Sequence, residues 1–132
     1  MDFSWPEEYI HYKEEVVSFA SNQLTNDLKE RDSEGTFSRE NWIKCAEFGL
    51  QGLSLPSNYG GKLDKPDFLR AMLAMEGFGF GCKDNGLSLA LNAQMWTVQK
   101  PILDFGNDDQ KARFLPSLAD GSKIACHALT EK

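Results

Sequence analysis

The residues from about 85 to 103 carry apolar side chains around nearly the whole circumference of a helix, and this feature constrains the fold most. A helix with one apolar stripe lies on the surface of a domain, but a helix that is apolar nearly all round must be buried on nearly all sides. A domain of four or five helices does not easily surround it, so the stretch indicates that further structure packs against this chain. Its apolar residues are Leu87, Leu89, Ala90, Leu91, Ala93, Met95, Trp96 and Val98.

Composition and charge narrow the class of protein. The chain has 132 residues, of which 41% are hydrophobic and 26% are charged, as in a globular domain with a hydrophobic core. The net charge of -6 argues against binding to nucleic acid and to an anionic membrane surface, both of which need a basic face. No apolar run approaches the roughly 20 residues that span a membrane. We therefore expect a soluble protein without nucleic-acid or membrane partners.

The few cysteines and histidines predict a reducing compartment and no metal site. Cys45, Cys82 and Cys126 are odd in number and far apart, which favours free thiols over a disulfide framework. The acidic and aromatic N-terminus lacks the pattern of a secretory signal. The only histidines, His11 and His127, are too few for a typical set of metal ligands. These features favour a cytoplasmic protein.

Apolar residues that recur at intervals of three and four predict helices along most of the chain. The run Ser-Trp-Pro-Glu at residues 4–7 has the form of a capping box, and a long helix is predicted from there to about Lys29. The run RDSEGTF at residues 31–37 is expected to break that helix. Ser38 is predicted to cap a second helix, and Gly49 is predicted to end it.

The second half of the chain is predicted to be helical as well. Asp64, Pro66 and Asp67 mark the start of a third helix, which the GFGFG run at residues 77–81 is expected to end. Residues 107–110 form a capping box for a short last helix. The sequence therefore predicts an all-α fold, an up-and-down bundle of about five to six helices. Among the residues expected to face its core are Ile43, Phe68, Leu69, Met72 and Phe114.

Two glycine-rich runs have both a nucleotide-binding and a structural interpretation. The GFGFG run lacks the preceding strand and the G-x-G-x-x-G spacing that cradle a pyrophosphate, so helix termination with close packing is the favoured interpretation. The YGG run at residues 59–61 is most simply a turn that needs a positive φ.

Four polar residues on the 85–103 helix leave its role open. Ligand pockets combine apolar walls with a few polar groups, so a pocket wall is one interpretation of this helix. Solvent-exposed positions on a core helix explain the same residues, and the pattern alone does not decide between the two. The four residues are Asn92, Gln94, Thr97 and Gln99.

The last apolar run, at residues 124–130, has no helix start and no partner strand, although it has the pattern of a beginning strand. Three motifs upstream and within it resemble the N-terminal domain of the acyl-CoA dehydrogenases. The run GLQGLSLPSNYGG at residues 49–61 is similar to the family pattern G-L-x-G-x-x-x-P-x-x-Y-G-G. The run PILDFGNDDQKARFLPSLADG at residues 101–121 is similar to P-I-x-x-x-G-x-x-x-Q-K-x-x-x-L-P-x-L-x-x-G. The run ALTE at residues 128–131 is similar to A-L-T-E-P, with Lys132 where the family has proline.

The resemblance implies a domain boundary close to the end of the chain. In the family, the helical N-terminal domain passes into a middle β-domain through the strand that carries the L-T-E-P segment. Residues 1–123 are therefore expected to form the helical domain, and residues 124–132 the start of the β-domain. Because a lone strand end has no ladder to join, this segment is expected to be frayed when isolated.

The resemblance also implies an FAD-dependent oxidoreductase of fatty acid metabolism. Such an enzyme takes an α-proton and a β-hydride from an acyl-CoA and forms a trans-2-enoyl-CoA and reduced FAD, which an electron-transfer flavoprotein reoxidises. The base is a glutamate of the C-terminal domain, so no catalytic residue is expected in this chain, and the chain alone is expected to be inactive. The intact protein is expected to be a homo-oligomer in which this domain packs on the middle and C-terminal domains.

Two groups of residues match functional segments of the family. Ala128, Leu129 and Thr130 match the segment that touches the flavin ring, and Thr130 is the expected hydrogen-bonding residue. The helix that matches residues 85–103 lines the far end of the acyl pocket in the family, and a bulky Trp96 that points inward would shorten the pocket. The candidates for selecting the acyl chain length are Asn92, Gln94, Met95, Trp96 and Gln99.

Two other functions stay open at this point. The chain is alternatively a non-catalytic helical interaction subunit that pairs with a separate flavin-binding chain, or part of a family member that acts on another acyl thioester in secondary metabolism. The coding sequence downstream of Lys132 separates the enzyme from the subunit. A continuing frame that encodes a β-domain supports the enzyme, and a stop codon supports the subunit.

Overall fold

The computed structural model describes residues 4–130, and most of these residues are helical. An isolated bridge between Pro56 and Leu63 is the only β-type pairing among them, so the predicted all-α fold class is confirmed. In chain order the elements are α1 (Glu7–Asn22), α2 (Leu28–Glu34), α3 (Arg39–Phe48), the short 3-10 helix η1 (Ser57–Tyr59), α4 (Phe68–Gly81), α5 (Asn85–Asn92), the π-helix η2 (Ala93–Gln99), α6 (Lys100–Phe105) and α7 (Asp108–Ala119).

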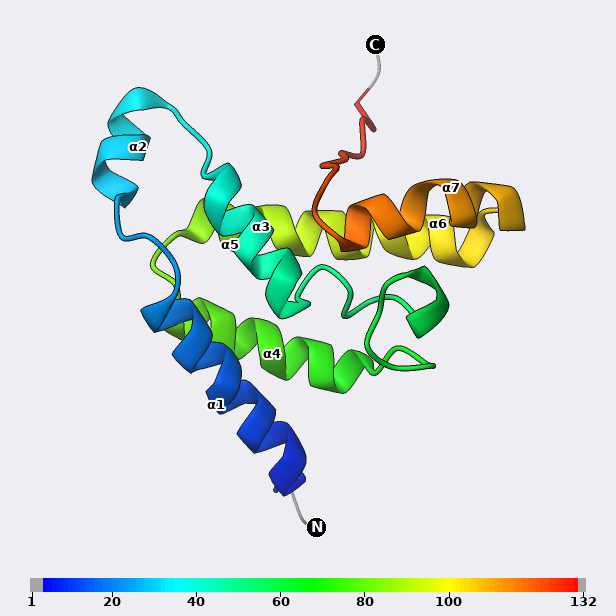
Figure 1. Cartoon of the computed structure of the whole chain (residues 1–132), viewed down its shortest axis with the longest axis horizontal. Helices are drawn as coiled ribbons and strands as arrows, with labels where there is room; N and C mark the ends of the chain where they lie inside the picture. The colour runs from blue at the N-terminus through cyan, green and yellow to red at the C-terminus, as the bar shows by residue number, and fades with distance from the viewer. Residues whose placement is uncertain (1–3, 131–132) are drawn as a thin grey trace.

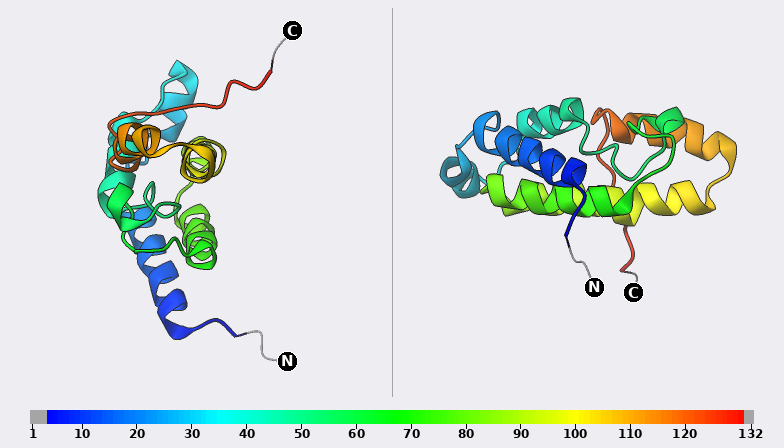
Figure 2. Two further views of the ribbon diagram at one scale, coloured as in Figure 1. Left: turned by 90° about the vertical axis from the view of Figure 1, so that its right-hand side faces the viewer. Right: turned by 90° about the horizontal axis from the view of Figure 1, so that it is seen from below.

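The helices pack in two layers, and α5, η2 and α6 follow one another as a single rod across the molecule (Figure 1). In the two views of Figure 2, α1, α3 and α7 lie in one layer, and α4 and the rod lie in the other. The predicted helix over residues 85–103 corresponds to this rod. The main core forms around large side chains that are at most 1% exposed: Trp42, Phe78, Leu87, Leu91 and Met95.

Two glycines of the GFGFG run allow α1 and α4 to pack closely. A Cβ atom at Gly77 would lie 2.8 Å from the carbonyl oxygen of Lys13, and one at Gly81 would lie 2.7 Å from that of Val17. The prediction that this run ends the helix is confirmed, because α4 ends at Gly81, the last residue of the run. The close helix packing that was expected at these glycines is confirmed.

The single long helix predicted from residue 4 to about residue 29 is wrong in two respects. The observed helix α1 has Pro6 as its N-cap and no side-chain cap, so the predicted capping box does not form. It also ends at Asn22, well before residue 29. The chain breaks there because Thr25 makes other hydrogen bonds: its N–H donates to Asn41 Oδ1 at 3.0 Å, and its hydroxyl donates to Asp27 Oδ1 at 2.9 Å. Such side-chain bonds compete with helical ones. Residues 28–34, partly predicted as the break, form α2 instead.

Other predicted helix ends are confirmed. The hydroxyl of Ser38 caps α3 by accepting a hydrogen bond from Asn41 N–H, and Gly49 ends the helix with a φ of 99°. At the start of α7, Asn107 and Gln110 form the reciprocal capping box that the sequence predicts.

Several large apolar side chains predicted to face the core are exposed instead. The buried residues of α4 are Ala71, Leu73, Ala74, Gly77 and Phe78, so Phe68, Leu69 and Met72 lie on the other side of this helix. These mispredicted residues are Ile43 (39% exposed), Phe68 (43%), Leu69 (40%), Met72 (66%) and Phe114 (38%).

No helix in the described part of the chain is both long and apolar enough to cross a membrane. Within residues 4–130, no three side chains of His, Cys, Asp or Glu come together in a way that could hold a metal ion.

Candidate functional site

A π-helix in the middle of the rod determines which side chains face inward. Lys100 N–H bonds to the carbonyl oxygen of Met95, five residues earlier, and this spacing defines a π-helix. Residues five apart therefore come close to one face, and Gln94 and Gln99 are 1% and 0% exposed. Periodicity based on 3.6 residues missed this element. Two glutamines at a spacing of five in an apolar helix were its only sequence signal.

Three of the five predicted pocket residues are engaged in the interior. Gln94 Nε2 donates to the carbonyl oxygen of Leu118 at 2.9 Å, and Gln94 Oε1 accepts from Ala125 N–H at 3.1 Å. Gln99 Oε1 accepts from the hydroxyl of Ser54 at 2.7 Å, whereas its Nε2 is buried without a hydrogen bond to any described residue. Met95 is fully buried in the main core.

The other two, Asn92 and Trp96, lie together at a partly exposed position. Trp96 Nε1 donates to Asn92 Oδ1 at 3.1 Å, and Asn92 Nδ2 donates to the carbonyl oxygen of Ser88 at 2.9 Å. The indole of Trp96 contacts the ring of Phe68 on α4, with ring centroids 5.9 Å apart and planes tilted by 59°. Lys100 Nζ lies 5.5 Å from the centroid of that phenylalanine ring. Two helices thus supply one aromatic pair.

This pair belongs to a larger apolar surface that sequence reasoning missed. Met72 lies one helical turn after Phe68 on α4, and Leu89 lies one turn before Asn92 on α5, so each is on the side of its helix that carries the residue named with it. Met72 is 66% exposed and Leu89 is 70% exposed. Exposed apolar side chains that gather on one side of neighbouring helices are typical of a binding or packing surface. We call it the α4–α5 face, and it consists of Phe68, Met72, Leu89, Asn92 and Trp96.

The segment after α7 leaves the helical layers past the rod. Gly121, with a φ of 75°, turns the chain, and its carbonyl oxygen accepts a 3.1 Å hydrogen bond from Trp42 Nε1. In both views of Figure 2 the segment then crosses from the layer of α7 past the layer of the rod. Residues 126–130 are exposed and make no hydrogen bond with any described residue. The predicted flavin-contacting residues Ala128, Leu129 and Thr130 therefore present free backbone groups.

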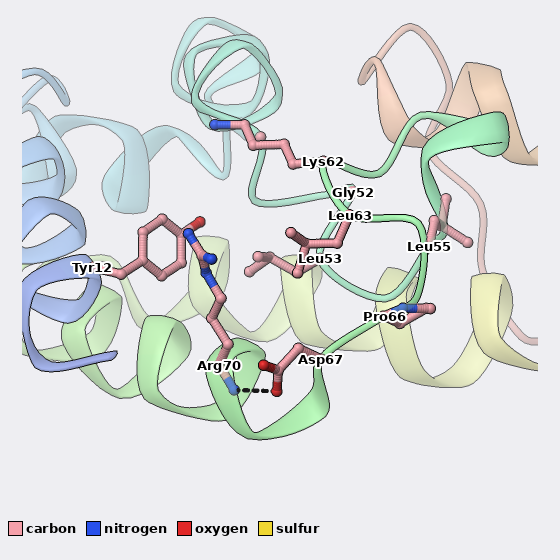
Figure 3. Close-up of a pocket in the computed structure, with 10 residues that line it drawn as sticks. Tyr12, Gly52, Leu53, Leu55, Lys62, Leu63, Pro66, Asp67 and Arg70 are labelled. Atoms are coloured by element: carbon pink, nitrogen blue, oxygen red, sulfur yellow. Dashed lines mark hydrogen bonds between the residues drawn. The ribbon is translucent and has the colours of Figure 1, made fainter. Parts of the chain in front are cut away.

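The loop at residues 49–61 closes a small pocket over α4, which Figure 3 shows. In this view the guanidinium of Arg70 stands beside the ring of Tyr12, at 4.0 Å from the ring centroid. Leu53 and Leu63 lie between these two residues and Leu55. The pocket holds about 20 Å³, enough for one water molecule and far too little for an acyl group. It is part of the loop packing rather than a substrate site.

The glycines of this loop explain its sequence pattern. Gly60 has a φ of 100°, which confirms the predicted turn with positive φ. A Cβ atom at Gly61 would lie 1.7 Å from the carbonyl oxygen of Leu55, so no larger residue fits there. This motif therefore holds the loop together by close backbone contact.

The carboxylate of Asp67 links α1 to the start of α4 beside the same pocket. It accepts a 2.5 Å hydrogen bond from the hydroxyl of Tyr9 and a 3.0 Å bond from Arg70 N–H. The bond from Tyr9 is the main cause that lowers the pKa of Asp67 below its ordinary value, and the backbone bond adds to it. This charge stabilises the start of α4, which carries part of the α4–α5 face.

The family can be assigned at this point by comparison with known proteins. The sequence model described as the N-terminal domain of acyl-CoA dehydrogenases matches residues 6–122. This chain belongs to the acyl-CoA dehydrogenase family. The resemblance based on three motifs is therefore confirmed over the helical part of the chain.

Curated relatives and solved structures show how much of a family member this domain represents. An L-prolyl-[peptidyl-carrier protein] dehydrogenase of Pseudomonas fluorescens is 34% identical over 131 residues, which are 99% of this chain and 33% of the relative. The crystal structure of the prolyl acyl carrier protein oxidase AnaB is 41% identical, with a TM-score of 0.86, over 92% of this chain and 32% of that chain. The structure of PigA with FAD and proline is 31% identical, with a TM-score of 0.84, over 94% of this chain and 32% of that chain. This acyl-CoA dehydrogenase domain thus spans about a third of the length of the relatives it matches.

Proposed function

We propose that the chain is the N-terminal domain of an FAD-dependent enzyme that oxidises an acyl thioester between its α- and β-carbons. In this reaction a base removes the α-proton, a hydride leaves the β-carbon, and a 2-enoyl thioester forms. FAD, which residues 128–130 would contact along one edge, would supply the acceptor for the hydride, and an electron-transfer flavoprotein would take up the electrons. The family assignment supports the proposal, and the described residues supply walls for the reacting molecules rather than the base.

The segment Ala128–Thr130 fits one edge of a flavin ring. Its backbone groups make no hydrogen bond with other described residues, and the side chain of Leu129 is 75% exposed. An isoalloxazine ring needs hydrogen bonds at its polar edge and apolar contacts on its faces, and this segment offers both. A ligand site buries most of its ligand, so an exposed segment forms one side of the site and other parts of the protein complete it.

The α4–α5 face supports the acyl pocket. It presents apolar side chains from two helices, together with one amide, that of Asn92, which is oriented by the indole of Trp96. This combination of an apolar wall and a single polar group suits an acyl chain. The rings of Phe68 and Trp96 contact each other within the face. We therefore propose that the pocket accepts a compact acyl group and that Trp96 limits its length.

The interior residues take a supporting role in this proposal. Met95 lies in the main core, Gln99 accepts a hydrogen bond from Ser54, and the side chain of Gln94 reaches from the rod to the segment after α7. They belong to the packed interior and do not touch the acyl group.

The thioester is proposed to carry a compact acyl group, such as a prolyl or butyryl group, on either a carrier protein or CoA. The similarity to prolyl-carrier protein dehydrogenases and oxidases supports the first source, and the family assignment supports the second. The carrier protein and CoA would present the same thioester to the α4–α5 face, so the structure of the face does not separate them. The assay below does.

Dye reduction by the intact protein that contains this domain tests the proposal. Prolyl-carrier protein, butyryl-CoA and octanoyl-CoA are each offered to the FAD-loaded protein, and the 132-residue chain alone is the control. We expect dye reduction with one of the two compact substrates, little with octanoyl-CoA, and none with the chain alone. Failure of the intact protein with all three substrates would contradict the proposed reaction and would favour a non-catalytic interaction subunit.

A further inference from the structure

We propose that Gln94 is a positioning residue that fixes the path of the segment after α7, and with it the flavin-contacting residues Ala128–Thr130. The inference rests on the proposed function only in the flavin contact. The position of the segment depends on this chain alone and is testable without FAD.

The amide of Gln94 joins two parts of the chain that are otherwise independent. Its Nε2 donates to the carbonyl oxygen of Leu118 near the end of α7, and its Oε1 accepts from Ala125 N–H in the segment. The side chain is 1% exposed, so water does not replace either bond easily. One buried amide thus connects the rod, the end of α7 and the segment.

The bond to Ala125 is the last one that holds the segment before the proposed flavin contact. Lys123 N–H donates to the carbonyl oxygen of Ser117 at 2.9 Å, and the Gln94 bond follows two residues later. Within residues 126–130, no hydrogen bond to any described residue follows it. Only two residues lie between Ala125 and Ala128, a reach of about 10 Å over three steps of the chain, so the direction set at Ala125 determines where Thr130 lies.

Glutamine suits this position because its amide provides one donor and one acceptor at once. Glutamate would offer no proton to the carbonyl oxygen of Leu118, and methionine would fill a similar volume without either hydrogen bond. The π-helix is the second requirement, because it turns residue 94 toward α7 while residue 99 also stays inside. A regular α-helix would place these two residues on different faces.

Hydrogen exchange and backbone relaxation of the 132-residue chain test the positioning. In Gln94→Met we expect the exchange of Ala125 N–H to rise about tenfold, since one net hydrogen bond is lost. We also expect the heteronuclear NOE values of residues 123–130 to fall. The matched control is Gln99→Met, which removes a buried amide of the same π-helix that does not contact the segment. Its Ala125 exchange is expected to stay within about twofold of the wild-type rate.

A second variant keeps the test valid if Gln94→Met does not fold. Ala125→Pro removes the N–H group that donates to Gln94 Oε1. Ala125 is half-buried and lies outside the core, so the core sequence is unchanged. It is expected to release residues 126–130 as Gln94→Met does. The inference is overturned if residues 126–130 relax in the folded variants as they do in the wild type. It is also overturned if Gln99→Met releases these residues as much as Gln94→Met does.

The FAD affinity of the intact protein separates a failure of this inference from a failure of the proposed function. We expect the FAD dissociation constant to rise about tenfold in Gln94→Met and to stay near the wild-type value in Gln99→Met. If the segment is released in the 132-residue chain but the FAD affinity is unchanged, the proposed flavin contact of Ala128–Thr130 is overturned. If the segment is not released, the positioning role of Gln94 is overturned whatever the affinity.

Discussion

The indole Nε1 of Trp42 donates a 3.1 Å hydrogen bond to the carbonyl oxygen of Gly121, which lies 79 residues further along the chain. The indole is fully buried, and Gly121 sits at the turn that leads from α7 into the segment after it. This bond therefore joins α3 to the place where the chain leaves the helical layers.

Trp42→Phe removes the donor and leaves the carbonyl oxygen of Gly121 buried without it. We expect a loss of about 1–3 kcal/mol in the free energy of unfolding, measured by urea denaturation. Trp96→Phe is the matched control, because its indole donates to the side chain of Asn92 at a partly exposed position where water substitutes. Equal losses in the two variants would contradict the importance of the Gly121 contact.

Three glycines of α4 give a prediction with an internal control. Gly77→Ala and Gly81→Ala place a Cβ atom 2.7–2.8 Å from backbone oxygens of α1, so both are expected to destabilise the protein by more than 1 kcal/mol. Gly79→Ala meets no atom within 4 Å and is expected to stabilise it by about 0.5–1 kcal/mol through helix propensity. Thermal melting of the three variants measures the signs. A destabilising effect of Gly79→Ala would argue against the described packing of α4.

These glycines also show what the sequence predicts and what it leaves open. The spacing of GFGFG excluded a nucleotide loop and indicated helix termination with close packing, but it did not show that α1 is the helix that packs there. In the same way, the break after Asn22 depends on Asn41, which accepts the N–H of Thr25 from a distant helix. Local sequence patterns do not show such long-range contacts, although these contacts decide where a helix begins and ends.

The candidate site was predictable in part for a related reason. The motif order identified the family and pointed to Asn92 and Trp96, which the structure brings together. Phe68 and Met72 were assigned to the core because α4 is apolar on two sides, and periodicity does not tell which side meets α1. A search for apolar residues at a period of 3.6 does not detect a π-helix. The sequence therefore did not predict that Gln94 faces the interior.

Asp67 gives the stability a pH dependence with a defined sign. Its pKa is lowered in the folded protein, mainly by the hydrogen bond from Tyr9, so the unfolded chain takes up the proton first as the pH falls. The stabilisation is complete above the ordinary pKa of 3.8 and is lost as the pH falls below it through the folded pKa. We expect the advantage of wild type over Asp67→Asn in urea unfolding to shrink between pH 5 and pH 2. Tyr9→Phe is the control and is expected to reduce that advantage already at neutral pH.

The three cysteines are expected to differ in reactivity. Cys45 and Cys82 are buried, and burial raises the pKa of both thiols, whereas Cys126 is exposed in the segment after α7. Titration of the native protein with a thiol reagent at pH 8 is expected to modify one thiol rapidly, and all three after unfolding in urea. Cys126→Ser is expected to abolish the rapid phase. A rapid phase that persists in this variant would contradict the burial of the other two.

The central claim is that the α4–α5 face forms a wall of the acyl pocket, and Trp96→Ala in the intact protein tests it most directly. The measurement is the ratio of kcat/KM for octanoyl-CoA to that for butyryl-CoA, with Phe105→Ala as control, since Phe105 is 87% exposed at the end of the same rod. We predict that Trp96→Ala raises this ratio about tenfold or more, because space for several methylene groups is opened, and that Phe105→Ala leaves it unchanged. An unchanged ratio in an active, folded Trp96→Ala protein would contradict the claim.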